Sequence, residues 1–246
     1  MKKQLILILA VVLVGMSSLK SEAQLISAPD FTIGLTLHGN LATNEFTGQM
    51  SGAARGENYG ALWGRGIGLH AKFGLDKWKN NRLTVGVNYD QFTNSGETGK
   101  SFFVTIPSNI PYTSYTMIGG SIGYEYVFGA RCKNRPYIGL GVNGTMIQTD
   151  AGNNPKGYEN AFRIGFELVS GVEFTFGDKS DMAFNLAGKY KLINPILNDN
   201  DNTPGNLNLN DGDGQGGSNY IRFIGWVGLE LGMNFNFGSK PLTLKR

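Results

Sequence analysis

Charged side chains recur at alternate positions along several apolar segments of this chain. The face that they share carries acids and bases together: His70, Lys72, Glu125, Arg163, Glu167, Glu173, Lys189, Arg222 and Glu230. Such a face could conduct protons, ions or small solutes through a narrow interior, or its opposite charges could pair with one another and fill that interior. The mixture of signs favours the self-paired polar network, and the narrow conduit is the alternative.

Catalysis would require a nucleophile beside a base. His38 and His70 are the only histidines, and His38 is the better candidate base because it faces the polar side near the end of its segment. No nucleophile motif accompanies it. The sequence therefore predicts no catalytic residue.

Metal binding has one candidate segment, the carboxylate-rich stretch 198–217. A helix-loop-helix calcium loop that begins with Asp211 and Asp213 would need a glutamate at its twelfth position, where Arg222 stands instead. We therefore predict a solvated loop and no cofactor or metal, with calcium bound in another geometry as the alternative. Cys132 is the only cysteine, so no disulfide is expected and the thiol is interpreted as incidental.

The elements that position these residues have an apolar residue at every second position. Four stretches end alike, with an apolar residue two before a phenylalanine-glycine pair: 68–74, 123–129, 171–177 and 232–238. A period of two is typical of a strand with one apolar face. Eight strands are predicted, each long enough to cross a bilayer: 31–41, 61–73, 83–92, 112–128, 137–147, 162–176, 182–192 and 220–237.

The predicted connections alternate between short polar turns and long segments of about 14 to 27 residues, as in barrels with short periplasmic turns and long outer loops. Backbone groups in lipid must be paired, so the eighth strand should pair with the first. The predicted periplasmic aromatic ring is Phe73, Phe128, Phe176 and Phe237. The predicted outer ring is Trp63, Tyr89, Phe92, Tyr112, Tyr158, Phe162, Tyr220 and Phe223.

The first residues predict export. Two lysines precede an apolar run at 5–14, and small residues follow at Ser21 and Ala23, which is typical of a secretory signal peptide. We therefore divide the chain into a signal peptide (1–23), a barrel (24–238) and a short periplasmic tail (239–246). The content of 36 glycines in 246 residues suits closely spaced strands, and a net charge of +3 does not indicate a nucleic-acid partner.

The final strand resembles the signal by which outer-membrane barrels are recognised for assembly: a polar residue, a spacer, glycine, two spacers, an apolar residue, a spacer and an apolar residue. Glu230, Gly232, Phe235 and Phe237 occupy these positions. Over the mature chain the protein resembles small eight-stranded outer-membrane proteins of the OmpA/OmpX/OmpW-like class. The resemblance implies an all-β, antiparallel up-and-down transmembrane barrel in the outer membrane of a Gram-negative bacterium. It also implies lipid, lipopolysaccharide and the barrel-assembly machinery as partners.

A fold-level resemblance carries no activity with it. The predicted function is a structural or surface-interaction role through four outer loops, which could bind an extracellular ligand, in a monomer that is not an enzyme. A passive channel, or a conduit for small solutes or apolar molecules, is the alternative. A lipid-modifying enzyme based on His38 is a more remote one.

Overall fold

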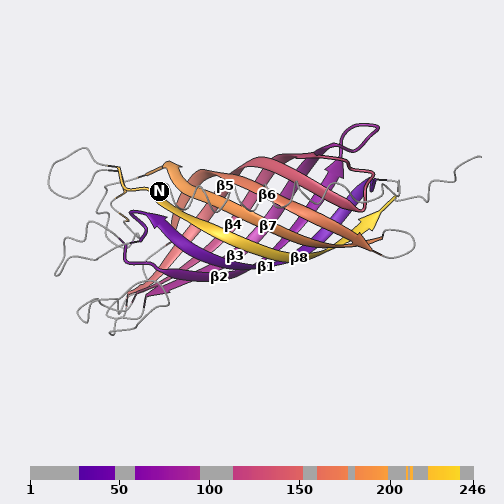
Figure 1. Ribbon diagram of the computed structural model, residues 1–246. Helices are drawn as coiled ribbons and strands as arrows, with labels where there is room; N and C mark the ends of the chain where they lie inside the picture. The colour runs from indigo at the N-terminus through magenta and orange to yellow at the C-terminus, as the bar shows by residue number, and fades with distance from the viewer. Residues whose placement is uncertain are drawn as a thin grey trace, which may run out of the picture.

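The computed structural model describes residues 28–47, 59–94, 113–151, 160–176, 181–198, 209, 211–212 and 221–238. Eight antiparallel strands close into one barrel in chain order, and β8 pairs with β1, as predicted (Figure 1). The strands are β1 (Phe31–Asn44), β2 (Trp63–Gly74), β3 (Asn81–Asn94), β4 (Thr113–Val127), β5 (Asn134–Ala151), β6 (Ala161–Phe176), β7 (Met182–Ile196) and β8 (Ile224–Phe237). The predicted signal peptide (1–23) and tail (239–246) lie outside the described residues.

The two ends of the barrel differ in the length of their connections. The segments 75–80, 128–133 and 177–181 join strands at one end, which we call the short-turn end. The longer segments 45–62, 95–112, 152–160 and 197–223 join them at the other, the long-loop end. Nothing among the described residues is a helix of the length and apolar character needed to span a membrane.

The side chains of each strand alternate between a lumen and an outer wall. Leu37 and Leu140 on the wall are 60% and 62% exposed, whereas the lumen residues Asn40 and Asn143 are 2% and 1% exposed. Apolar side chains thus cover the outside of the barrel and polar ones its inside, the reverse of a water-soluble protein. An apolar wall of this extent needs a nonaqueous cover.

Five strands are longer than predicted, and β2, β4 and β8 are shorter. β5 begins at Asn134 and β7 continues to Ile196, because ladder pairing persists beyond the apolar pattern. By contrast, β8 begins at Ile224, so Arg222 precedes the strand in which it was predicted. Its carbonyl accepts a hydrogen bond from Asn194 Nδ2 at 2.7 Å, and its amide donates to the Asp211 carbonyl at 3.2 Å. At Arg222 these contacts replace the ladder hydrogen bonds that a longer β8 would form.

An irregularity in β7 turns two residues into the lumen. The β6–β7 register shifts between Ile164, which pairs with Ile196, and Phe166, which pairs with Leu192. The extra residues on β7 break the alternation of faces, as a bulge does. Ile193 and Asn194 are consequently both fully buried.

Candidate functional site

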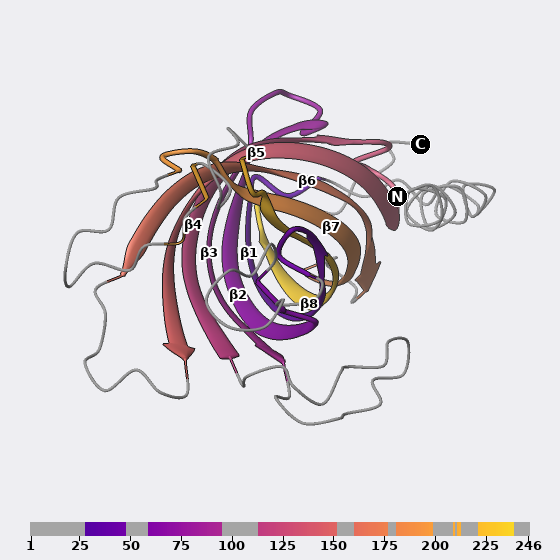
Figure 2. The ribbon, with the colours of Figure 1, turned by 90° about the vertical axis from the view of Figure 1, so that its left-hand side faces the viewer.

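The long-loop end of the lumen is filled by aromatic rings. We call Phe46, Tyr59, Phe92, Tyr115 and Trp226 the outer plug; all are at most 6% exposed. The Phe46 ring centroid lies 4.9 Å from that of Phe92 and 5.3 Å from that of Tyr115, and Phe92 lies 5.0 Å from Trp226. Figure 2 shows the chain at the end of β1 curling into the mouth of the barrel. Phe46 follows β1 by two residues and contacts the other rings of the plug there.

Phe92 was predicted in the outer aromatic ring of the wall, and that prediction is wrong. It shares the inward face of β3 with Asn88 and Asp90 and is fully buried. The facing residue of β2 is Gly64, where an added Cβ would lie 2.5 Å from the Phe92 ring. The glycine therefore provides the space that admits this ring into the lumen.

Hydrogen bonds fasten the long-loop segments over the outer plug. Tyr115 Oη donates to the Tyr59 carbonyl at 2.7 Å, and Tyr59 Oη donates to the Leu209 carbonyl at 2.8 Å. Arg222 donates to the same Leu209 carbonyl at 2.6 Å and lies 4.5 Å from the Tyr59 ring centroid. Burial raises the pKa of Tyr59 well above its ordinary value, so its hydroxyl remains a donor.

A buried ion pair lies beside these hydrogen bonds, and we call the residues of both sets, Tyr59, Arg163, Asn194, Leu209, Asp211 and Arg222, the cap. Arg163 Nε and Nη2 each donate to an Asp211 oxygen at 2.9 Å, and Asn194 Nδ2 donates to Asp211 Oδ2 at 2.7 Å. Arg163 and Arg222, both predicted in the charged lumen network, thus belong to the cap at the mouth. Asp213 lies outside the described residues, and no group of three or more potential metal ligands occurs within them.

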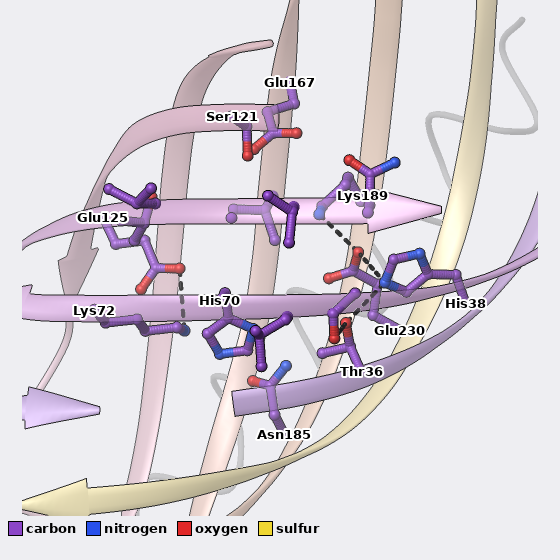
Figure 3. Close-up of a pocket in the computed structure, with 18 of the residues that line it drawn as sticks. Thr36, His38, His70, Lys72, Ser121, Glu125, Glu167, Asn185, Lys189 and Glu230 are labelled. Atoms are coloured by element: carbon purple, nitrogen blue, oxygen red, sulfur yellow. Dashed lines mark hydrogen bonds and ion pairs between the residues drawn. The ribbon is translucent and has the colours of Figure 1, made fainter. Parts of the chain in front are cut away.

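A cluster around His38 occupies the middle of the lumen (Figure 3). His38 Nδ1 lies 3.1 Å from Asp90 Oδ1, and Nε2 lies 2.7 Å from Thr36 Oγ1 and 3.4 Å from Glu230 Oε1. Lys189 Nζ approaches Glu230 at 2.7 Å. Hydroxyl, imidazole and carboxylate in this order resemble a nucleophile with its base. However, Glu230 shares Nε2 with the hydroxyl, and the arrangement is equally that of a buried proton-sharing network.

The short-turn half of the lumen holds a second cluster, the inner ion network of Lys72, Arg82, Glu125 and Glu173. Lys72 Nζ lies 3.1 Å from Glu125 and 3.0 Å from Glu173, and Arg82 Nη1 lies 2.9 Å from Glu173. The Lys72 ammonium also lies 4.3 Å from the Tyr137 ring centroid. These pairs join β2, β3, β4 and β6 across the barrel interior.

The remaining predicted lumen residues lie between these clusters. His70 Nε2 is 3.1 Å from Asn234 Oδ1, and Glu167 is 4.0 Å from Lys191 Nζ. The sequence interpretation missed Arg82 and Arg135 because its strands began two and three residues too late, respectively. Arg135 is fully buried, and its Nη atoms have no hydrogen-bond partner among the described residues.

The space left between the networks is small. A polar cavity of about 60 Å³ is lined by residues that include Ser121, Glu125, Glu167, Lys189 and Glu230 (Figure 3). At roughly 10–15 Å³ for each water, it can hold about four to six water molecules. The cavity is therefore suited to water and small ions rather than to an organic substrate.

The outer wall carries the predicted periplasmic ring at the short-turn end. Phe73, Phe128, Phe176 and Phe237 are 41–51% exposed. The Phe31 ring lies 4.9 Å from Phe73 and 5.8 Å from Phe237, which joins β2, β1 and β8 in one aromatic band.

The residues of the predicted assembly signal all lie on β8. Phe235 and Phe237 point outward, with exposures of 45% and 51%, while Glu230 points inward to its ion pairs. At Gly232 an added Cβ would lie 2.6 Å from the Leu35 carbonyl of β1. Phe235 and Phe237 thus contribute to the wall, Glu230 to the lumen and Gly232 to the closure of the barrel.

Neither a protein-family model nor a curated protein sequence matches this chain. Among solved structures, Neisserial surface protein A superposes with a TM-score of 0.51 at 15% identity, covering 85% of this chain and 99% of that one. OprG from Pseudomonas aeruginosa gives 0.49 at 15% identity, covering 88% and 99%. The outer membrane protease OmpT from Escherichia coli gives 0.36 at 11% identity, covering 86% and 95%. The superposition on Neisserial surface protein A and the closed barrel of eight strands show the fold of small eight-stranded outer-membrane barrels.

Proposed function

We propose that this protein is an integral outer-membrane barrel with a closed lumen, which acts as a structural element or as a surface for interactions at its long-loop end. One observation carries the proposal: the lumen is closed by the outer plug at one end and by the inner ion network at the other, with a cavity of only about 60 Å³ between them. The apolar wall supports membrane insertion, since its exposed side chains need lipid around them.

The same observation favours a role without catalysis. The Thr36–His38–Asp90 arrangement lies beneath the outer plug, beside a cavity of about 60 Å³. A lipid substrate would need a far larger opening. His38 is therefore proposed to contribute to the polar network, and a His38→Ala variant should leave the lipid composition of the host membrane unchanged.

The wall and the final strand support the proposed partners. We propose that phospholipid and lipopolysaccharide surround the apolar wall and that the assembly machinery recognises β8. A monomer is favoured because every strand of the barrel has two paired neighbours, which leaves no free edge for another copy. We also propose that the long loops bind an extracellular ligand.

Single-channel recording in a planar bilayer tests the closed lumen. The intact protein should give no sustained conductance steps, whereas steps well above those of the bare bilayer would overturn the proposal in favour of a channel. A Ser121→Trp variant, which places a bulky group at the cavity, is the matched control. Steps that this variant abolishes would assign the conductance to the lumen.

Cysteine labelling of intact cells tests the orientation. In a Cys132→Ser background, Ile221→Cys and Lys77→Cys place thiols on exposed residues at the long-loop and short-turn ends respectively. A membrane-impermeant maleimide should label Ile221→Cys on intact cells and Lys77→Cys only after permeabilisation. The opposite pattern would contradict surface display of the long loops.

A further inference from the structure

Two neighbouring short turns carry exposed apolar and cationic side chains together. In the turn between β2 and β3, Leu75 and Trp78 are 59% and 53% exposed, and Lys77 beside them is exposed too. The turn between β4 and β5 contributes Arg131 and an exposed Lys133. Turns in water are usually polar, so a large exposed indole there points to a contact.

The Trp78 ring joins the two turns. The guanidinium carbon of Arg131 lies 4.1 Å from the ring centroid, within the range of a cation–π contact, and Lys77 Nζ lies 6.0 Å from it. Stacking on the ring face leaves the edge of the guanidinium, with its N–H donors, available to an acceptor. We call Lys77, Trp78, Arg131 and Lys133 the turn patch.

The acids near the turn patch are already engaged. Asp30 pairs with Lys79 at 3.1 Å. Asp76 accepts hydrogen bonds from the backbone amides of Asn80 and Asn81 at 3.2 and 3.1 Å. Within the part of the chain that the structure describes, Lys77, Arg131 and Lys133 have no acidic partner. No described carboxylate forms an ion pair with these three cations, and they outnumber the ionised Asp76 beside Lys77, so the patch carries an excess of positive charge.

The patch begins where the aromatic band ends. Phe73 is the penultimate residue of β2, and Phe128 is the first residue of the turn after β4; both are exposed on the outer wall. Tryptophan, lysine and arginine immediately beyond a membrane-facing aromatic ring lie at the depth of the lipid headgroups. Each cation near an anionic surface adds about a fivefold preference for anionic lipid.

We propose that the turn patch binds the phosphate of an anionic phospholipid headgroup in the leaflet that faces the short turns. This inference rests on the proposed membrane function, since it needs the barrel to be inserted. Arg131 is the principal phosphate donor, held in place by Trp78, while Lys77 and Lys133 add charge on either side. One side of the barrel, near β2 to β5, is thereby anchored to anionic lipid.

Quenching of Trp78 fluorescence by brominated lipid tests the proposal. The full mature chain carries Trp63→Phe to remove the exposed tryptophan of the wall, while the 2% exposed Trp226 supplies a constant background. The protein is refolded into phosphatidylcholine vesicles that contain brominated phosphatidylglycerol or, at the same mole fraction, brominated phosphatidylcholine. Phosphatidylglycerol should quench Trp78 several-fold more strongly, and the difference should shrink with added salt.

Two single variants with the same change in charge separate a binding site from net charge. Arg131→Gln should lower the preference for phosphatidylglycerol about fivefold. Lys79→Gln removes a cation that Asp30 already neutralises, and it should change the preference less than about twofold. Equal effects of the two variants would overturn the patch as a site.

Insertion is measured separately, by vesicle flotation and resistance to heat unfolding on gels. A protein that inserts but is quenched equally by the two lipids overturns this inference alone and leaves an acidic protein segment as the partner. A protein that does not insert contradicts the proposed membrane function instead.

Discussion

The two halves of the lumen are closed by opposite means. The outer plug closes the long-loop half with ring contacts such as Phe46 to Phe92 at 4.9 Å. The inner ion network closes the other half with pairs such as Arg82 to Glu173 at 2.9 Å. Truncation of a packed apolar side chain leaves a cavity into which its neighbours can partly relax, whereas a buried charge left without its partner is costly. A single substitution in the ion network should therefore lower the free energy of unfolding more than one in the outer plug.

The largest effect is expected at Glu173, which is fully buried and accepts bonds from Lys72, Arg82 and Asn234. Glu173→Ala leaves two buried cations without this carboxylate, so we expect a loss of about 3–5 kcal/mol in the free energy of unfolding. Urea unfolding of the vesicle-embedded protein measures it. Adding Arg82→Met removes one of these cations and leaves the Lys72–Glu125 pair intact, so it should recover part of the loss. A double variant no better than Glu173→Ala would contradict the charge-pair explanation.

A smaller effect is expected at Phe92 in the outer plug. Phe92→Ala should cost about 3 kcal/mol, the lower end for such truncations, because water at the mouth can enter the vacated space. The same urea titration measures this change. Gly64→Ala should cost about 1–3 kcal/mol on its own, since its Cβ meets the Phe92 ring. The double variant should cost less than the sum, and strict additivity would show that the two residues do not pack together.

The cap should contribute less to the free energy of unfolding than either Glu173 or Phe92. Tyr59→Phe removes one donor to the Leu209 carbonyl and should cost about 1 kcal/mol at neutral pH. Because burial raises the pKa of Tyr59, its contribution is complete below the ordinary value near 10 and declines as the pH rises above it. Unfolding titrations in alkaline buffers should thus show the two proteins converging. A constant difference would mean that Tyr59 is not buried in the folded state.

The smallest effect belongs to an exposed turn that lies outside both halves. Asp76→Asn weakens the bonds from the Asn80 and Asn81 amides and should cost about 0.5 kcal/mol. Burial raises the pKa of Asp76, but the hydrogen bonds from the Asn81 side chain and from the backbone amides together outweigh it, so the pKa lies below its ordinary value. Its contribution is therefore present at neutral pH and is lost as the pH falls below about 4. Heat-unfolding midpoints of the intact protein and of Asp76→Asn, measured between pH 3 and pH 7, check this. If the difference between the two midpoints did not narrow at low pH, the prediction would be wrong.

The barrel was predictable because lipid exposure leaves a period of two along each strand. Phe235 and Phe237 show it plainly, since both lie on the wall. The outer plug was not predictable in the same way. The alternation along their strands places Trp226 and Tyr115 on the lumen face. However, aromatic residues near a strand end are also typical of the ring at a membrane interface. Phe46 and Tyr59 come from the connection between β1 and β2, where no period guides the interpretation.

The charge pairs show a second limit. Lys72 and Glu173 were both predicted in the lumen, yet their contact joins β2 to β6 across the barrel. Such pairing depends on the stagger of the strands, which the sequence does not display. Arg82 and Arg135 were missed because they stand at strand starts, where the apolar alternation that marks a strand has not yet begun.

The pairing of β1 with β8 also governs how the chain can acquire its structure. Phe31 pairs with Phe237, so the first strand must wait for the last before its second edge is covered. Contacts of such long sequence separation form slowly. An incomplete chain would keep open strand edges that invite aggregation. We therefore expect the barrel to close only once its final strand is available. A chain that lacks β8 should be cleared by proteolysis rather than survive as a smaller barrel.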